Sequence, residues 1–129
     1  MSSKIAAKNK ISRPEQLKDL IVDSIQEKKG EEIVVLDLRN LEDTVTDFFV
    51  ICHAQSNTQV RSISDFIMDN VVEKSKEKAY RYEGMDNLEW VIIDYVNVVV
   101  HVFVQEKRTY YKLEELWADA VETQVSATH

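Results

Sequence analysis

Three aspartates stand at the ends of apolar runs, where side chains from neighbouring strands can meet. Asp37 closes one run, Asp47 precedes a second, and Asp94 lies near the end of a third. Carboxylates that converge on one point can hold metal ions for nucleotide chemistry, as they do in two-metal sites. Aspartates at strand ends are more often turn or cap residues. Spacing along the chain does not show convergence in space, so both interpretations stay open.

Other sequence features expected of an enzyme or a metal site are missing. The 2 glycines, Gly30 and Gly84, are too few for a dinucleotide-binding fingerprint or a P-loop, and there is no nucleophile elbow. The 3 histidines are too scattered for a helical metal-binding pair. Cys52 lies inside an apolar run, where we expect a small buried hydrophobe and not a nucleophile. We therefore expect no metal and no cofactor.

The charge balance limits the classes of partner. The chain has 129 residues with 16 basic and 23 acidic side chains, so its formal net charge is −7. Phosphate backbones repel an acidic chain, and we expect little direct contact with RNA. No apolar stretch approaches the roughly 20 residues of a membrane span, and the basic first residues lack the apolar core of a secretion signal. The single cysteine fits a reducing compartment. We expect a cytoplasmic protein without membrane contact.

Alternating helix and strand patterns predict a single α/β domain. Ser12 and Glu15 have the spacing of a capping box, and an apolar stripe with helical spacing follows them. Ser56 opens a second, longer helix in the same way. Residues 33–38 and 48–54 are nearly continuous apolar runs, which are typical of strands covered on both faces.

The two ends of the chain set the expected domain boundaries. We expect a flexible basic leader at residues 1–13, a folded domain at residues 14–121 and a flexible tail at residues 122–129. The last helix of the domain is expected to pack against the sheet edge through one apolar side, formed by Leu113, Leu116, Trp117 and Ala120.

Two β-rich runs, residues 90–95 and 98–104, are separated only by Val96 and Asn97, which favours a two-residue hairpin. In that register one face is mostly aliphatic and suits packing under helices, because side chains alternate along each strand. The opposite face consists of Trp90, Ile92, Asp94, Val99, His101 and Phe103.

This second face of the hairpin mixes aromatic side chains with a carboxylate and an imidazole. Such a composition is typical of the centre of a protein interface, so the face is a candidate docking surface. The alternative is a second buried layer in which His101 is hydrogen-bonded inside the protein. Composition does not decide between the two.

Several blocks of sequence follow one another in a distinctive order between about Leu17 and Ala120. They are DFFVIC (47–52), SN and QV (56–60), YEG (82–84), EWVIIDY (89–95), VVVHVF (98–103) and LE with LWADA (113–120). In this order the blocks resemble the Iojap family, the ribosomal silencing factors. The resemblance implies a mixed sheet flanked by helices, similar in outline to nucleotidyltransferases. The glycine of their catalytic motif has no counterpart in residues 53–56, so the resemblance argues against an enzyme.

The resemblance also implies a partner and a mode of action. Members of this family bind the large ribosomal subunit through its fourteenth-numbered protein, beside the surface that meets the small subunit. Bound there, they block subunit joining and lower translation. The family's contact surface carries over here to Trp90, with Ile92, Asp94, His101 and Phe103 beside it. The alternatives are a metal-dependent nucleotidyltransferase, degenerate or active, and a homodimer closed through the same aromatic face.

The turn of the hairpin departs from the family pattern. Many relatives have a glycine-containing turn where this chain has Val96 and Asn97. A β-branched residue resists the positive φ of a type I′ turn, so a different loop or register is an alternative.

Overall fold

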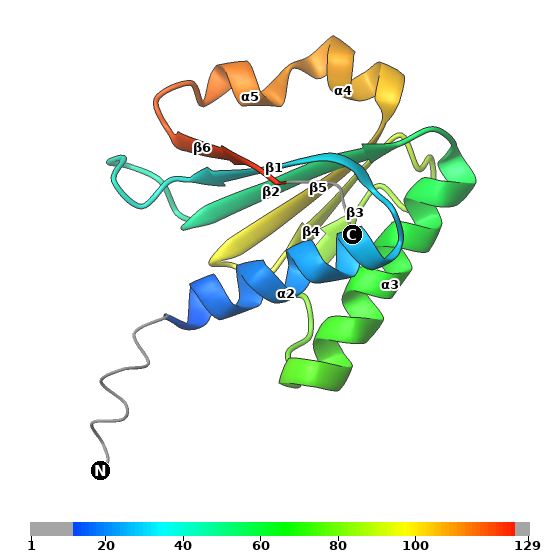
Figure 1. Ribbon diagram of the computed structural model, residues 1–129, viewed down its shortest axis with the longest axis horizontal. Helices are drawn as coiled ribbons and strands as arrows, with labels where there is room; N and C mark the ends of the chain where they lie inside the picture. The colour runs from blue at the N-terminus through cyan, green and yellow to red at the C-terminus, as the bar shows by residue number, and fades with distance from the viewer. Residues whose placement is uncertain (1–11, 126–129) are drawn as a thin grey trace.

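The computed structural model describes residues 12–125; residues 1–11 and 126–129, which hold most of the expected leader and part of the expected tail, lie outside the described part. One mixed sheet runs through the centre in the strand order β3-β4-β5-β2-β1-β6. Figure 1 shows α2 and α3 against one face of this sheet and α4 and α5 against the other. In chain order the elements are α2 (Arg13–Glu27), β1 (Glu31–Asp37), β2 (Phe48–Ala54), α3 (Asn57–Ser75), β3 (Arg81–Glu83), β4 (Trp90–Asp94), β5 (Val98–Val104), α4 (Gln105–Tyr111), α5 (Leu113–Leu116) and β6 (Val121–Gln124).

Both long helices begin at the serines that the sequence indicated. The Ser12 hydroxyl accepts the Glu15 backbone N–H at 3.3 Å, and the Glu15 carboxylate accepts the Ser12 N–H at 3.4 Å. This reciprocal pair satisfies two backbone donors at the start of α2. The Ser56 hydroxyl accepts the Gln59 N–H at 3.1 Å at the start of α3. The apolar stripes that follow are buried against the sheet, as their spacing predicted.

The predicted class, a single α/β domain with a mixed sheet flanked by helices, is confirmed. β2 and β5 pair in parallel, whereas the pairs of β1 with β2 and β6, and of β4 with β3 and β5, are antiparallel. β1, β2 and β5 lie inside the sheet and are nearly continuous in apolar residues, because α2 and α3 cover one face and α4 and α5 cover part of the other. The two edge strands, β3 and β6, are short and exposed.

Two apolar clusters sit on opposite faces of the sheet. The larger lies under α2 and α3 and includes Val91, Ile93, Val100 and Val102 from the hairpin. The smaller lies under α5 and includes Phe103, which is fully buried. The expected hairpin register is confirmed, with Trp90 opposite Phe103. The aliphatic face therefore packs under the long helices, as predicted.

The C-terminal part differs from the expectation in two ways. The single final helix is wrong: Lys112, with a φ of 48°, separates α4 from α5, and α5 lies over a face of the sheet and not at its edge. Ordered structure also continues past residue 121, because β6 pairs with β1. All four residues of β6 are exposed, so the strand has no apolar alternation that the sequence could have shown.

The turn between β4 and β5 keeps the register despite its valine. Val96 has a φ of 75°, and the Asn97 N–H donates to the Tyr95 carbonyl at 2.9 Å, two residues back. This is a γ-turn with positive φ, a strained form, and not a type I′ turn. The Asp94 carboxylate accepts the Val96 N–H at 2.7 Å and so helps to hold the turn.

Replacing the strained valine should stabilise the protein. A non-glycine residue at positive φ stores strain on the order of 1–3 kcal/mol, and glycine releases it at a cost in unfolded-chain entropy of up to about 1 kcal/mol. We expect Val96→Gly to raise the free energy of unfolding in urea by about 1 kcal/mol. Val45→Gly is the matched control: Val45 is 93% exposed and is not among the residues with positive φ, so that variant should lose stability. A loss in both variants would contradict the strain at Val96.

Candidate functional site

Trp90 lies at the centre of an aromatic cluster on the second face of the sheet. Its indole stacks on Phe103 with ring centroids 4.9 Å apart and meets Tyr111 of α4 at 4.7 Å. The indole N–H donates to His101 Nδ1 at 3.1 Å. The far side of His101 meets Phe49 edge-on at 4.8 Å. The indole is therefore fixed by one hydrogen bond and two ring contacts, and it stays half-buried.

His101 is neutral in this setting. Burial lowers the pKa of its imidazole to about 4, because the charged form would lose its hydration. Nδ1 accepts the indole N–H, so the proton of the neutral ring is on Nε2. Nε2 is buried and has no hydrogen-bond partner among the described residues. The residue therefore acts as a support for Trp90 and not as a proton donor at the surface.

The five residues singled out from the sequence share one face, but they are not equally accessible. Trp90, Ile92 and Asp94 are half-buried, whereas His101 is 5% exposed and Phe103 is fully buried. The buried-layer interpretation describes the two β5 residues, and the docking interpretation of the β4 residues stays a prediction. The β4 side chains reach the surface, and the two β5 side chains form the layer beneath them.

Sequence reasoning missed three aromatic residues that complete this surface. Tyr111 covers the indole from α4, and Phe49 of β2 stands edge-on to Trp117 at 5.4 Å. Alternation along β2 places Phe49 opposite in orientation to the core residue Phe48, and that signal was available. Tyr111 gave no such signal, because its position depends on the break between α4 and α5.

A buried arginine holds α4 in place. Arg108 Nη1 donates to the Glu32 carbonyl at 2.7 Å and lies 3.0 Å from His53 Nδ1, while Nη2 donates to Glu114 at 2.6 Å. The Glu32 carbonyl is available because the register of β1 shifts between Glu31 and Val34. Burial, and next the charge of Arg108, lower the pKa of His53, so this ring too is neutral and accepts from the arginine.

The three candidate carboxylates do not converge. Asp37 forms a two-pronged contact with Arg39, at 2.9 and 2.7 Å, and the hydrogen bond from Arg39 lowers its pKa. Asp47 lies 3.4 Å from the Asn97 amide, and Asp94 contacts Arg81 at 3.5 Å. Within residues 12–125 no group of three His, Cys, Asp or Glu side chains could hold a metal ion. The turn and cap interpretation of these aspartates fits their contacts.

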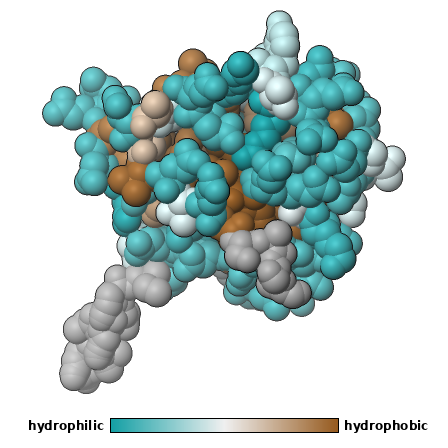
Figure 2. Space-filling model, turned by 45° about the horizontal axis from the view of Figure 1, so that its top comes forward, coloured by the Kyte–Doolittle hydropathy of each residue, from teal (hydrophilic) through white to brown (hydrophobic). Residues whose placement is uncertain are grey.

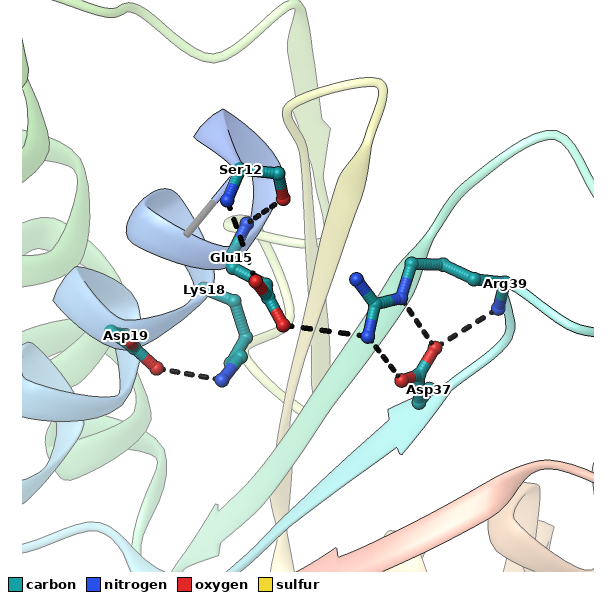
Figure 3. Close-up of polar contacts among 6 residues, drawn as sticks. All are labelled: Ser12, Glu15, Lys18, Asp19, Asp37 and Arg39. Carbon is teal, nitrogen blue, oxygen red and sulfur yellow. Dashed lines mark hydrogen bonds and ion pairs between the residues drawn. The ribbon is translucent and has the colours of Figure 1, made fainter. Parts of the chain in front are cut away.

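Arg39 also ties the end of β1 to α2. Figure 3 shows its guanidinium between Asp37 and Glu15, the latter at 3.4 Å. The same guanidinium lies 4.8 Å from the Phe48 ring, on the face of the sheet under α2 and α3. These carboxylates are therefore engaged in structural contacts at the start of α2.

Comparison with known proteins assigns the chain to a family. Residues 11–129 match the family model described as "Ribosomal silencing factor during starvation". The chain belongs to this ribosomal silencing factor family. It is 42% identical to the RsfS protein of Bacillus subtilis over 94 residues, which are 73% of this chain and 78% of that protein. It is 39% identical to the RsfS protein of Halalkalibacterium halodurans over 106 residues, which are 82% of this chain and 89% of that protein.

The fold agrees with this assignment. A crystal structure of a protein from Chromobacterium violaceum superposes with a TM-score of 0.78 at 27% identity, covering 83% of this chain and 88% of that one. The resemblance to the ribosomal silencing factors drawn from the sequence is thus confirmed. None of the described helices is long and apolar enough to cross a membrane.

The neutral state of His101 predicts a pH dependence of stability. Its folded pKa of about 4 lies below the ordinary value of 6.5, so the stability it contributes is present above pH 6.5 and is lost as pH falls toward 4. The two values imply a loss of about 3 kcal/mol across this window. We expect His101→Gln to flatten the dependence of the unfolding free energy measured in urea between pH 7 and pH 4.5. An equally steep dependence in His101→Gln and in wild type would contradict the assignment.

Proposed function

We propose that this chain silences translation by occupying the large ribosomal subunit. The surface around Trp90 binds the subunit's fourteenth-numbered protein, and the bound chain blocks joining of the small subunit. No covalent bond forms or breaks, and the protein works in the cytoplasm without a cofactor. Membership of the ribosomal silencing factor family supports a ribosome-associated silencing role.

The fixed indole of Trp90 is the observation that carries this proposal. The half-buried Trp90 is already held by the hydrogen bond to His101 and by stacking on Phe103. It therefore loses little further side-chain entropy when a partner covers it. Rigid aromatic side chains of this kind are common anchors of protein interfaces. Ile92 and Asp94 lie beside it on β4 and add an apolar and an acidic contact.

The charge of the chain favours a protein surface over RNA as the point of contact. With a net charge of −7, the chain is repelled by phosphates and attracted by the lysines and arginines of a basic protein. Figure 2 shows a mainly polar surface in which brown apolar patches appear between polar side chains. Apolar anchors with acidic neighbours suit a basic protein patch on the subunit.

The contacts of the aspartates favour occupancy over catalysis. Asp37 is held by Arg39, and Asp94 serves the turn through the Val96 N–H and contacts Arg81. A nucleotidyltransferase would need such carboxylates free to share a metal ion. The engaged carboxylates support a protein that acts by binding alone.

Variants of the β4 surface test the proposal. Trp90→Ala and Ile92→Glu should each weaken co-sedimentation with purified large subunits at least roughly thirtyfold, since anchor truncation costs about 2 kcal/mol or more. Because Trp90 also supports its neighbours, Ile92→Glu keeps the test valid if Trp90→Ala loses structure by circular dichroism. Tyr82→Ala is the control. Tyr82 lies on an edge strand and pairs with Ile93, which points to the other face of the sheet from Ile92, so this variant should bind as wild type does.

A gradient profile tests the second half of the proposal. Saturating wild-type protein should reduce the fraction of joined ribosomes formed from purified subunits, and Ile92→Glu should restore it. Full subunit joining in the presence of saturating, bound wild-type protein would exclude steric blocking.

A further inference from the structure

The two short C-terminal helices leave part of the second sheet face open. α5 packs over Phe103 through its own Leu113, toward one end of the sheet. Toward the hairpin turn lies a hollow of about 460 Å³, with an apolar floor that includes Leu38, Phe49 and Val99. A volume in this range accommodates one large apolar side chain of a partner together with its backbone.

A second hollow adjoins the first. It has a volume of about 430 Å³ and lies between α5 and the segment after β1, with Leu41 and Leu116 among its lining. Trp117 lines both hollows, so the two share one wall residue. We call the two hollows together the Trp117 groove.

The charge of the Trp117 groove has one sign. Of the described residues that line it, five are acidic and none is basic; the acidic ones are Glu42, Asp43, Asp94, Glu115 and Asp119. Asp94 contacts Arg81, whereas the ion pairs among the described residues include none of the other four. A cationic partner would therefore find most of these carboxylates available.

The larger hollow also has an unused polar atom. Thr46 lines the hollow and is 7% exposed, and its hydroxyl is buried without a hydrogen-bond partner among the described residues. A buried hydroxyl without a partner is costly, which a partner's backbone group could relieve. Val45, at the same hollow, is 93% exposed, an unusual state for a large apolar side chain.

We propose that the Trp117 groove binds a lysine- or arginine-rich segment of the ribosomal protein partner, with one large apolar side chain in the larger hollow. This inference rests on the proposed function and names the chemistry of the partner segment. The apolar side chain meets Phe49, Val99 and Trp117, while the flanking cations meet the carboxylates. RNA does not fit the groove, because its phosphates would face the same carboxylates.

A labelled peptide tests the chemistry of the groove directly. The probe is fluorescein-Lys-Lys-Gly-Lys-Leu-Lys-Gly-Lys-Lys, titrated with the full chain and followed by fluorescence anisotropy at low salt. We expect saturable binding that weakens with salt, roughly tenfold weaker binding when the leucine is replaced by serine, and no binding when the lysines are replaced by glutamates. Equal binding of the leucine and serine peptides would overturn the apolar part of the proposal.

Variants of the groove locate the binding. Val45→Lys, and the double change Glu42→Gln with Asp43→Asn, should each weaken the probe and the large subunit at least about tenfold. Asparagine at position 43 tolerates the positive φ of 67° found there. The control, Asp65→Asn with Glu73→Gln on α3, changes the net charge equally at exposed positions. It should bind as wild type does.

The outcomes separate this inference from the proposed function. If wild type and the groove variants bind large subunits equally, the groove assignment is wrong and the proposed function stands. If wild type binds the basic peptide but no large subunit, the proposed function fails and the groove chemistry stands. If wild type is a dimer in sedimentation velocity and Val45→Lys is a monomer, a second copy of the chain occupies the groove, and the inference is overturned.

Discussion

The register between β4 and β5 is the constraint on which both faces of the sheet depend. A shift by one residue would turn every side chain of β4 to the opposite face, placing Trp90 among the aliphatic residues under α2 and α3. The hydrogen bond from the indole to His101 and the stacking on Phe103 are possible only in the observed register. The strain at Val96 is tolerated because these contacts, and the apolar packing on the other face, determine the pairing more strongly than the turn does.

The second face of the sheet is partly open because the helices that cover it are short. α4 and α5 together span only residues 105–116, and the hollow near the hairpin turn lies outside their cover. Arg108 fixes where that cover sits, since its guanidinium is satisfied only beside the shifted carbonyl of Glu32 and the carboxylate of Glu114. Tyr111 reaches the indole from this position, and the face nearer the turn remains open. The half-buried position of Trp90 and the open Trp117 groove thus both follow from the way α4 and α5 pack on the sheet.

Much of the fold could be predicted from the sequence, for physical reasons. Capping boxes, apolar runs and period-2 alternation are local patterns, and they indicated both long helices, the central strands and the two faces of the hairpin. The break at Lys112 and the strand β6 left no such pattern, because they depend on pairing with distant β1 and on a left-handed residue. The burial of Phe103 under α5 could not be predicted for the same reason. The sequence therefore indicated which residues share one face of the sheet, but not which of them reach the surface.

The distribution of charge also shows why net charge alone predicts little. Phe48 lies on the face of the sheet under α2 and α3. There Arg39 and Lys18 lie over its ring and neutralise the charges of Asp37 and Asp19. The Trp117 groove has no such counterions among its described lining residues. The excess negative charge therefore acts most strongly where apolar surface is also exposed. An acidic chain with its charge spread evenly would only be repelled by a particle rich in RNA, whereas the arrangement proposed here would favour the basic protein surfaces that such a particle presents.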